Sequence, residues 1–138
     1  MTSPEAAERQ LCGLVNGLAH QIGEHLRLRA AKLGLTAPQA TALRELSGPM
    51  TTGELADRMS CEPSNATFVV DKLEKQGLIE RRPHPSDRRA RHLVLTAKGT
   101  ALRSDLLDLL GQESPLAGLT KAEQATLQAL LDRAITNR

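Results

Sequence analysis

The chain has 138 residues, a formal net charge of +2 and a single aromatic residue, Phe68. Its apolar residues are mostly 24 Leu and 18 Ala, against four Val and three Ile, a balance that favours helices and excludes an all-β fold. Two cysteines, Cys12 and Cys61, are too few for a disulfide-rich secreted domain. The N-terminus lacks the pattern of a signal peptide, and no apolar stretch reaches the ~20 residues that cross a bilayer. We therefore expect a cytoplasmic protein with no membrane role.

The charge is concentrated in one part of the chain. Residues 72–98 hold eight Lys or Arg against three Asp or Glu, a net +5, so the rest of the chain carries −3. A basic block in a mildly acidic chain is typical of a protein with one surface that meets a polyanion. A solvated basic loop is the alternative, and the elements predicted around the block decide between the two.

A long helix is predicted over residues 4–31, where apolar residues recur at spacings of three and four. Gly34 fits the stop of this helix. Thr36 as N-cap and Pro38 in the first turn then predict a second helix over residues 37–47.

Two short helices follow and form a predicted helix-turn-helix. Thr51 and Glu54 have the spacing of a capping box and begin the first of them, which ends near Met59. Pro63 opens the second, over residues 63–76. Two short helices joined by a turn of three or four residues are typical of this motif.

A different pattern follows the fourth helix. Short strands are predicted over residues 78–82 and 91–96, and residues 83–90 form the turn of this basic hairpin, which we call the wing. Two more helices are predicted, one over residues 97–112 and one that begins after the Thr120–Glu123 capping box. The fold class is therefore mainly α with a small β-hairpin wing.

The first helix and the last two are too apolar on one face to stand alone in water. They must pack together or against a second copy of the chain, and we favour a second copy because a two-fold dimer reads a palindromic DNA site. Residues 1–34 and 97–138 are accordingly assigned to dimerisation helices, and residues 35–96 to a DNA-binding lobe, within a single continuous domain.

The outer face of the helix predicted over residues 63–76 is polar at its N-terminal end. Small hydroxyl and amide side chains at this place suit the reading of base edges in the major groove. The residues that we expect at the DNA are Ser64, Asn65, Thr67, Phe68 and Lys72.

Phe68 is unusual because burial is the common fate of an aromatic side chain, yet the helical wheel places it opposite the core face. Two interpretations remain open. The ring contacts a thymine methyl group or a sugar, or it packs against a neighbouring element.

The wing completes the expected site. Arg88, Arg89 and Arg91 can reach a minor groove or its phosphates, and arginine suits phosphate better than lysine does. Asp87 would repel phosphate, so we expect it to structure the wing, either by pairing with a nearby arginine or by capping the turn.

The order of the elements and the segment DKLEKQGLIERRPHPSDRRARHLVLTAKG at 71–99 resemble the MarR (multiple-antibiotic-resistance regulator) family of winged helix-turn-helix transcriptional regulators. The resemblance covers essentially the whole chain. Its most specific motifs are the Asp-x-Arg wing signature at Asp87-Arg88-Arg89 and the Leu-Thr-x-x-Gly pattern that starts at Leu95 and ends at Gly99. It implies that Arg89 enters a minor groove and that residues 64–68 begin the base-reading helix.

Two residues depart from the family pattern. Glu62 stands where such helices usually carry a Ser-like N-cap; an acid there favours the helix dipole but faces the DNA. Phe68 stands where the family commonly has a polar or basic residue, which leaves the operator sequence open.

The resemblance also implies a small lipophilic or anionic effector, held between the dimerisation helices and the DNA-binding lobe. With so few aromatic residues, Leu and Ala would line its pocket. His20 and Glu24 are polar handles on the first helix, one turn apart, and could share a metal. No further His or Cys at ligand spacing accompanies them, so we expect a solvated helix face, no metal site and no cofactor.

Cys12 is similar to the sensing cysteine of the peroxide-responsive branch of the family, where an oxidised thiol releases DNA. In that branch tyrosines help to hold the thiolate, and this chain has none. Arg9 is the available positive partner for a reactive thiol. Of the two interpretations, a redox switch and a cysteine packed at an interface, we favour the second.

The sequence thus predicts a dimeric, sequence-specific transcriptional regulator, a repressor released by a ligand. The alternative from another class is a winged-helix protein-interaction module that does not read DNA and docks its partner through Phe68. An enzyme is not expected, because the sequence has no paired nucleophile and base, no Gly-rich phosphate loop and no metal cluster.

Overall fold

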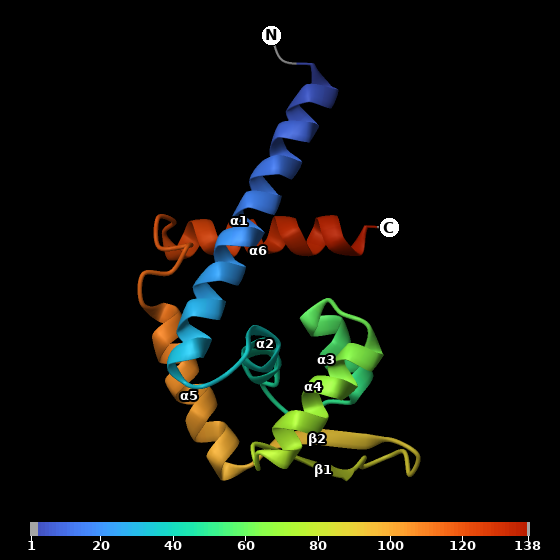
Figure 1. The fold of residues 1–138 in the computed structure, drawn as a ribbon. Helices are drawn as coiled ribbons and strands as arrows, with labels where there is room; N and C mark the ends of the chain where they lie inside the picture. Colours follow the sequence, from blue (N-terminus) through green and yellow to red (C-terminus); the bar gives the residue numbers. More distant parts are fainter. Residues whose placement is uncertain (1–2, 138) are drawn as a thin grey trace. The chain divides into compact units, whose positions relative to one another are not determined.

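The computed structural model of the chain describes residues 3–137 (Figure 1). It is mainly helical with one two-stranded antiparallel hairpin, which confirms the predicted fold class. None of the helices in this described range is long and apolar enough to span a membrane. The elements are α1 (Pro4–Lys32), α2 (Ala37–Glu45), α3 (Thr52–Met59), α4 (Pro63–Lys75), β1 (Ile79–Pro83), β2 (Arg91–Leu95), α5 (Ala97–Gly111) and α6 (Lys121–Thr136).

Contacts divide the described chain into two compact units. One consists of residues 3–22 and 113–137, and the other of residues 23–112, which include α2–α5 and the hairpin. Helix α1 runs through both units. The assignment of the terminal helices to dimerisation is not decided by this division and stays a prediction.

The helix ends follow the predicted capping residues. Thr36, Thr51 and Thr120 each accept a hydrogen bond from the backbone amide three residues later, and the side chain there accepts one from the threonine's own amide. These reciprocal bonds satisfy amides that have no partner within the helix. Gly34 and Gly77 end α1 and α4 with φ of +72° and +75°, a conformation that glycine adopts without strain.

The wing strands differ slightly from their predicted bounds. Their antiparallel register runs from Ile79 opposite Leu95 to Pro83 opposite Arg91. Both ends of β1 therefore lie one residue later than the predicted range of 78–82, and Pro83 is its last residue. Proline lacks only the N–H donor, and β1 is an edge strand, where that donor is not needed.

A third segment pairs with the wing and was not predicted. Met50, just before α3, forms an isolated antiparallel bridge with Leu93. The Leu93 amide donates to the Met50 carbonyl oxygen at 2.8 Å, and the Met50 amide donates to the Leu93 carbonyl oxygen at 3.3 Å. The bridge ties the helix-turn-helix to the base of the wing.

The apolar core lies in the unit of residues 23–112. Fully buried leucines come from five different elements: Leu43 of α2, Leu55 of α3, Leu73 of α4, Leu93 of β2 and Leu106 of α5. Helices α3 and α4 lie side by side, as the helix-turn-helix prediction requires (Figure 1). Residues of α4 and of the base of the wing thus share one core.

The other unit has a different character. None of its described residues, 3–22 and 113–137, is buried. Large apolar side chains remain open on both of its helices, with Leu14 of α1 67% exposed and Ile135 of α6 62% exposed. An exposed apolar surface of this kind is typical of an interaction site.

Candidate DNA interface

Helix α4 presents the predicted reading residues because its apolar residues repeat on one side only. Ala66, Val69, Val70 and Leu73 are buried against α2 and α3. The opposite side carries the residues predicted from the helical wheel, and all of them are exposed: Ser64, Asn65, Thr67, Phe68 and Lys72.

The N-terminus of α4 is open. Glu62 is the N-cap residue but forms no side-chain capping bond. Pro63 has no N–H and the Asn65 amide donates to the Glu62 carbonyl oxygen at 3.0 Å, so no side chain caps this end of the helix. Thr67 donates its hydroxyl to the Pro63 carbonyl oxygen at 2.9 Å, which fixes its rotamer and leaves the hydroxyl oxygen free to accept.

Phe68 points away from the core, as predicted, and the residue is 61% exposed. The ammonium group of Lys72, one turn later, lies 4.5 Å from the centre of the ring. This cation–π contact orders two exposed side chains on the face predicted to meet DNA.

The wing turn is organised by a histidine that the sequence analysis did not select. The Nδ1 atom of His84 accepts hydrogen bonds from the backbone amides of Ser86 and Asp87, both at 3.1 Å. The His84 ring also lies against His92 on the opposite strand, with ring centres 4.3 Å apart. A ring nitrogen that accepts two amides acts as the cap of this turn, a function for which the sequence offered no recognised signal.

Asp87 takes the second of its two predicted roles. Its carboxylate accepts the backbone amide of Arg89 at 2.9 Å and so caps the turn. Among the ion pairs of residues 3–137, none joins Asp87 to an arginine. Arg88, Arg89 and Arg91 are all exposed, and their use at a minor groove stays a prediction.

An ion-pair cluster between the wing and α4 was also missed. The guanidinium group of Arg81 in β1 hydrogen-bonds to the Asp71 carboxylate, and its Nε atom lies 3.5 Å from Oε2 of Glu74. Both acids belong to α4, one turn apart. The sequence signal was present in retrospect, as two acids spaced i, i+3 shortly before an arginine-containing strand.

The Leu-Thr-x-x-Gly motif closes the base of the wing. Thr96 donates its hydroxyl to the Gly77 carbonyl oxygen at 2.6 Å and accepts the Gly99 amide at 3.0 Å. The Thr96 amide donates to the Leu78 carbonyl oxygen at 3.1 Å. One threonine thus joins the end of α4 to the start of α5.

Glu54 has the clearest perturbed carboxyl group of the lobe. Its Oε1 atom accepts the Thr51 backbone amide at 3.1 Å in the capping box. The backbone hydrogen bond to Thr51 is the main cause that lowers the pKa of Glu54, followed by the side-chain bond to Thr51; His92 and Arg58 act in the same direction and desolvation opposes them.

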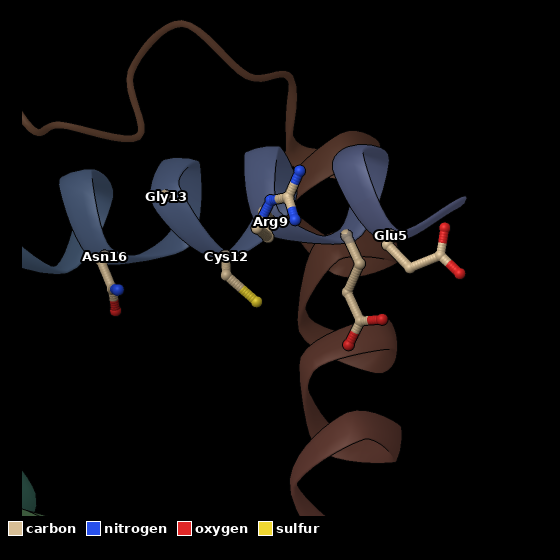
Figure 2. A pocket seen from close by; sticks show the side chains of 6 residues that line it. Glu5, Arg9, Cys12, Gly13 and Asn16 are labelled. Atoms are coloured by element: carbon tan, nitrogen blue, oxygen red, sulfur yellow. The ribbon is translucent and has the colours of Figure 1, made fainter. Parts of the chain in front are cut away.

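Cys12 lies on an exposed part of α1, in a shallow depression that Glu5, Arg9 and Asn16 also line. Figure 2 shows the Cys12 sulfur and the Arg9 guanidinium projecting in different directions from the helix. The redox interpretation of Cys12 therefore stays a prediction. Cys61, in the turn before α4, is half-buried.

His20 and Glu24, the two polar residues of α1 that were considered as effector or metal contacts, have different surroundings. His20 is exposed, whereas Glu24 holds Arg27 through a bidentate pair at 3.1 and 2.9 Å. The hydrogen bond and the charge of Glu24 raise the pKa of Arg27. Within residues 3–137, no group of three or more His, Cys, Asp or Glu could hold a metal ion.

Comparison with known proteins agrees with this geometry. The MarR family profile matches residues 35–90, which contain α2–α4 and most of the wing. The uncharacterised HTH-type transcriptional regulator YkoM of Bacillus subtilis is 30% identical over 118 residues, which are 82% of this chain and 76% of that protein. The chain belongs to the MarR family.

Solved MarR-family structures have the same fold. The transcriptional regulator PA3341 is 30% identical, with a TM-score of 0.80 over 92% of this chain and 96% of that one. A mutant form of MarR from Escherichia coli, solved with operator DNA, is 27% identical, with a TM-score of 0.72 over 96% of this chain and 99% of that one. The MarR-family protein described here is thus a transcriptional regulator and not an enzyme, as the sequence predicted.

Proposed function

We propose that this MarR-family regulator binds a palindromic operator as a homodimer and acts as a cytoplasmic repressor. The observation that carries the proposal is the joint exposure of polar side chains on α4 and arginines on the wing, within one lobe that shares a core. In this arrangement Ser64 and Asn65 read base edges in the major groove, and Arg89 enters the adjacent minor groove. The solved complex of a relative with operator DNA supports the binding of operator DNA by this fold.

The homodimer rests on the unit formed by the ends of the chain. None of its described residues is buried, and the apolar residues Leu11, Leu14 and Leu130 are each at least half exposed. A second copy that packs against these side chains would remove the apolar surface from water and place two α4 helices on one duplex.

Selection of bound duplexes from a random pool, followed by sedimentation of the selected complex, tests both parts. We expect a palindrome whose half-sites lie about one helical turn apart, bound by two chains. Single half-sites bound by one chain would contradict the dimer. If the selection enriches no sequence, the proposal of a sequence-specific regulator is contradicted.

The salt dependence of the binding affinity distinguishes a DNA-binding regulator from the alternative, a winged-helix protein-interaction module. If phosphates dominate the binding, the logarithm of the affinity falls linearly with the logarithm of salt concentration, with a slope of about −0.9 per phosphate contact. An interface centred on the exposed ring of Phe68 would depend little on salt.

Release by a small effector is a further part of the proposal, and it is supported by family membership. The probes are an aromatic carboxylate and a neutral phenol, titrated against the operator complex. Loss of the complex together with a raised unfolding temperature of the free protein would support an effector site, because a ligand that binds the folded state stabilises it. Absence of both effects would argue against these two classes.

A further inference from the structure

We propose that Arg81 is a positioning residue for operator recognition, which sets the angle between α4 and the wing by holding Asp71 and Glu74. This inference rests on the proposed function, since it concerns how the two DNA-contacting elements are presented. Arg81 is not expected to touch DNA itself, and it was not among the residues selected from the sequence.

The geometry of the cluster is that of a clamp. Arg81 is the third residue of β1, and Asp71 and Glu74 lie one turn apart on α4. Its guanidinium group hydrogen-bonds to Asp71 while its Nε atom lies 3.5 Å from Glu74. A planar fork that engages two carboxylates on one helix face restrains direction as well as distance.

The ion pairs of Arg81 lie farther along the hairpin than the short connection between α4 and β1, which is the hinge of the wing. Only residues 76–78 connect α4 to β1, and Gly77 among them has a positive φ. The bonds of Thr96 to Gly77 and Leu78 hold the strand at that hinge and act close to the pivot. Among the ion pairs in the described chain, those of Arg81 alone join α4 to the hairpin.

The side of the strand also matters. Arg81 pairs with Leu93, whose side chain is fully buried, so both side chains belong to the inner face of the hairpin. The Arg81 side chain is 33% exposed, against 63% for the next residue, Arg82. Arg82 pairs with Glu80 of its own strand and ties nothing to α4.

The angle has a direct consequence for DNA binding. The reading residues lie at the start of α4 and Arg88 and Arg89 lie at the wing tip, on opposite sides of the hinge. The grooves of a duplex have fixed spacing, so both sets engage together only when the angle is correct.

Arg82 provides a matched control because Arg81→Met and Arg82→Met each remove one positive charge from neighbouring positions of the same strand. The measurement is the affinity for the selected operator and for random duplex DNA, at two salt concentrations. Both variants should weaken binding to random DNA by the same small factor. Only Arg81→Met should also lower the operator-to-random ratio, by on the order of tenfold.

An exchange variant keeps the test decisive if Arg81→Met unfolds. Asp71→Arg and Arg81→Asp should each lower the operator-to-random ratio, and the double variant Asp71→Arg/Arg81→Asp should recover part of it, with an unfolding temperature near that of the wild type. Net charge cannot explain a loss that both single variants share, because Asp71→Arg raises the net charge by two and Arg81→Asp lowers it by two.

The outcomes separate this inference from the proposed function. If the wild type prefers an operator but the Arg81 and Arg82 variants lose affinity equally, or if the exchange variant recovers nothing, Arg81 does not position the wing. If the wild type shows no preference for any duplex, the proposed function and this inference both fail.

Discussion

Gly99 lies so close to Leu78 that a Cβ atom at position 99 would be 2.0 Å from the Leu78 carbonyl oxygen and 2.9 Å from its carbonyl carbon. The neighbour is backbone and cannot rotate away. The final glycine of the Leu-Thr-x-x-Gly motif is therefore required by the packing of α5 against the segment between α4 and β1, before any requirement of DNA binding. Gly99→Ala should destabilise the protein by about 3 kcal/mol or more, because relief of the overlap must move the backbone.

Urea unfolding at one protein concentration measures this effect, and Gly111→Ala is the control. Gly111 is the last residue of α5, and nothing lies within 4 Å of a Cβ atom placed there. We expect Gly111→Ala to be neutral or to stabilise by less than about 1 kcal/mol. Equal stability of the two variants would show that the close approach at Gly99 is relieved without penalty.

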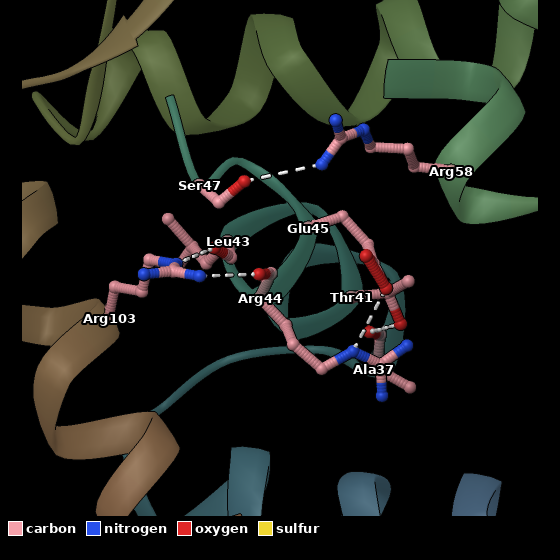
Figure 3. Close-up of polar contacts among 8 residues, drawn as sticks. All are labelled: Ala37, Thr41, Leu43, Arg44, Glu45, Ser47, Arg58 and Arg103. Atoms are coloured by element: carbon pink, nitrogen blue, oxygen red, sulfur yellow. Dashed lines mark hydrogen bonds and ion pairs between the residues drawn. The ribbon is translucent and has the colours of Figure 1, made fainter. Parts of the chain in front are cut away.

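Arg103 holds the C-terminal end of α2 in place (Figure 3). From α5 its Nε atom donates to the Leu43 carbonyl oxygen at 2.8 Å and its Nη2 atom donates to the Arg44 carbonyl oxygen at 2.9 Å. Arg103→Met removes both donors, keeps the aliphatic stem and should destabilise the protein by about 1–2 kcal/mol. Arg103→Lys should recover only part of this stability, since an ammonium group lacks the fork that meets two carbonyl oxygens. Full stability of the methionine variant in urea unfolding would refute the assignment.

The capping box of α3 should give the stability a component that depends on pH. The pKa of Glu54 is lowered from its ordinary value of 4.5, chiefly by the backbone hydrogen bond to Thr51. A carboxyl group whose pKa is lower in the folded state stabilises the protein fully above the unfolded-state pKa, and this contribution disappears as the pH falls through the folded-state pKa. The contribution should therefore be constant above about pH 5.5 and decline below about pH 4.5.

Glu54→Gln tests this sign, because glutamine keeps the acceptor oxygen of the capping box but does not titrate. Unfolding free energies of the wild type and of this variant, measured between pH 3 and pH 7, should differ most at neutral pH and converge in acid. A difference that grows as the pH falls would contradict the direction assigned to Glu54.

Cys12 should not act as a peroxide switch, because the guanidinium of Arg9, the positive partner expected for its thiolate, points elsewhere. After limiting organic peroxide, the wild type and Cys12→Ser should retain the same operator affinity, with mass spectrometry to follow any oxidation. Cys61→Ser is the control for the second thiol. Loss of operator binding in the wild type and its retention in Cys12→Ser would establish the redox alternative instead.

The sequence predicted the helices of this protein closely because their boundaries are set by local bonds. Thr36, Thr51 and Thr120 cap through amides only three residues away, and this spacing is visible in the sequence. The exposure of Phe68 followed from helical periodicity alone, since four apolar residues already occupied the inner face of α4.

The contacts between elements could not be predicted in the same way. The Arg81 clamp depends on how Gly77 turns the chain, and the bridge between Met50 and Leu93 joins residues from distant parts of the sequence. Arginines next to Asp87 in the sequence were compatible with both predicted roles, an ion pair with an arginine side chain and a cap on the backbone. Only the geometry of the turn shows that Asp87 accepts a backbone amide.

Phe68 should recognise the methyl group of a thymine in the operator. Its ring is exposed on the reading face of α4, and Lys72 restrains it through the cation–π contact at 4.5 Å. Replacing that thymine by deoxyuridine removes one methyl group and should weaken binding about fourfold, from roughly 0.8 kcal/mol per buried carbon. Phe68→Ala should bind the thymine and deoxyuridine operators equally, with the salt dependence of the wild type, because no charge has been removed. Scanning each thymine of the selected operator, one at a time, locates the contact and supplies internal controls at the remaining positions. A folded Phe68→Ala protein with unchanged operator affinity would exclude the contact and leave the exposed ring to a protein partner.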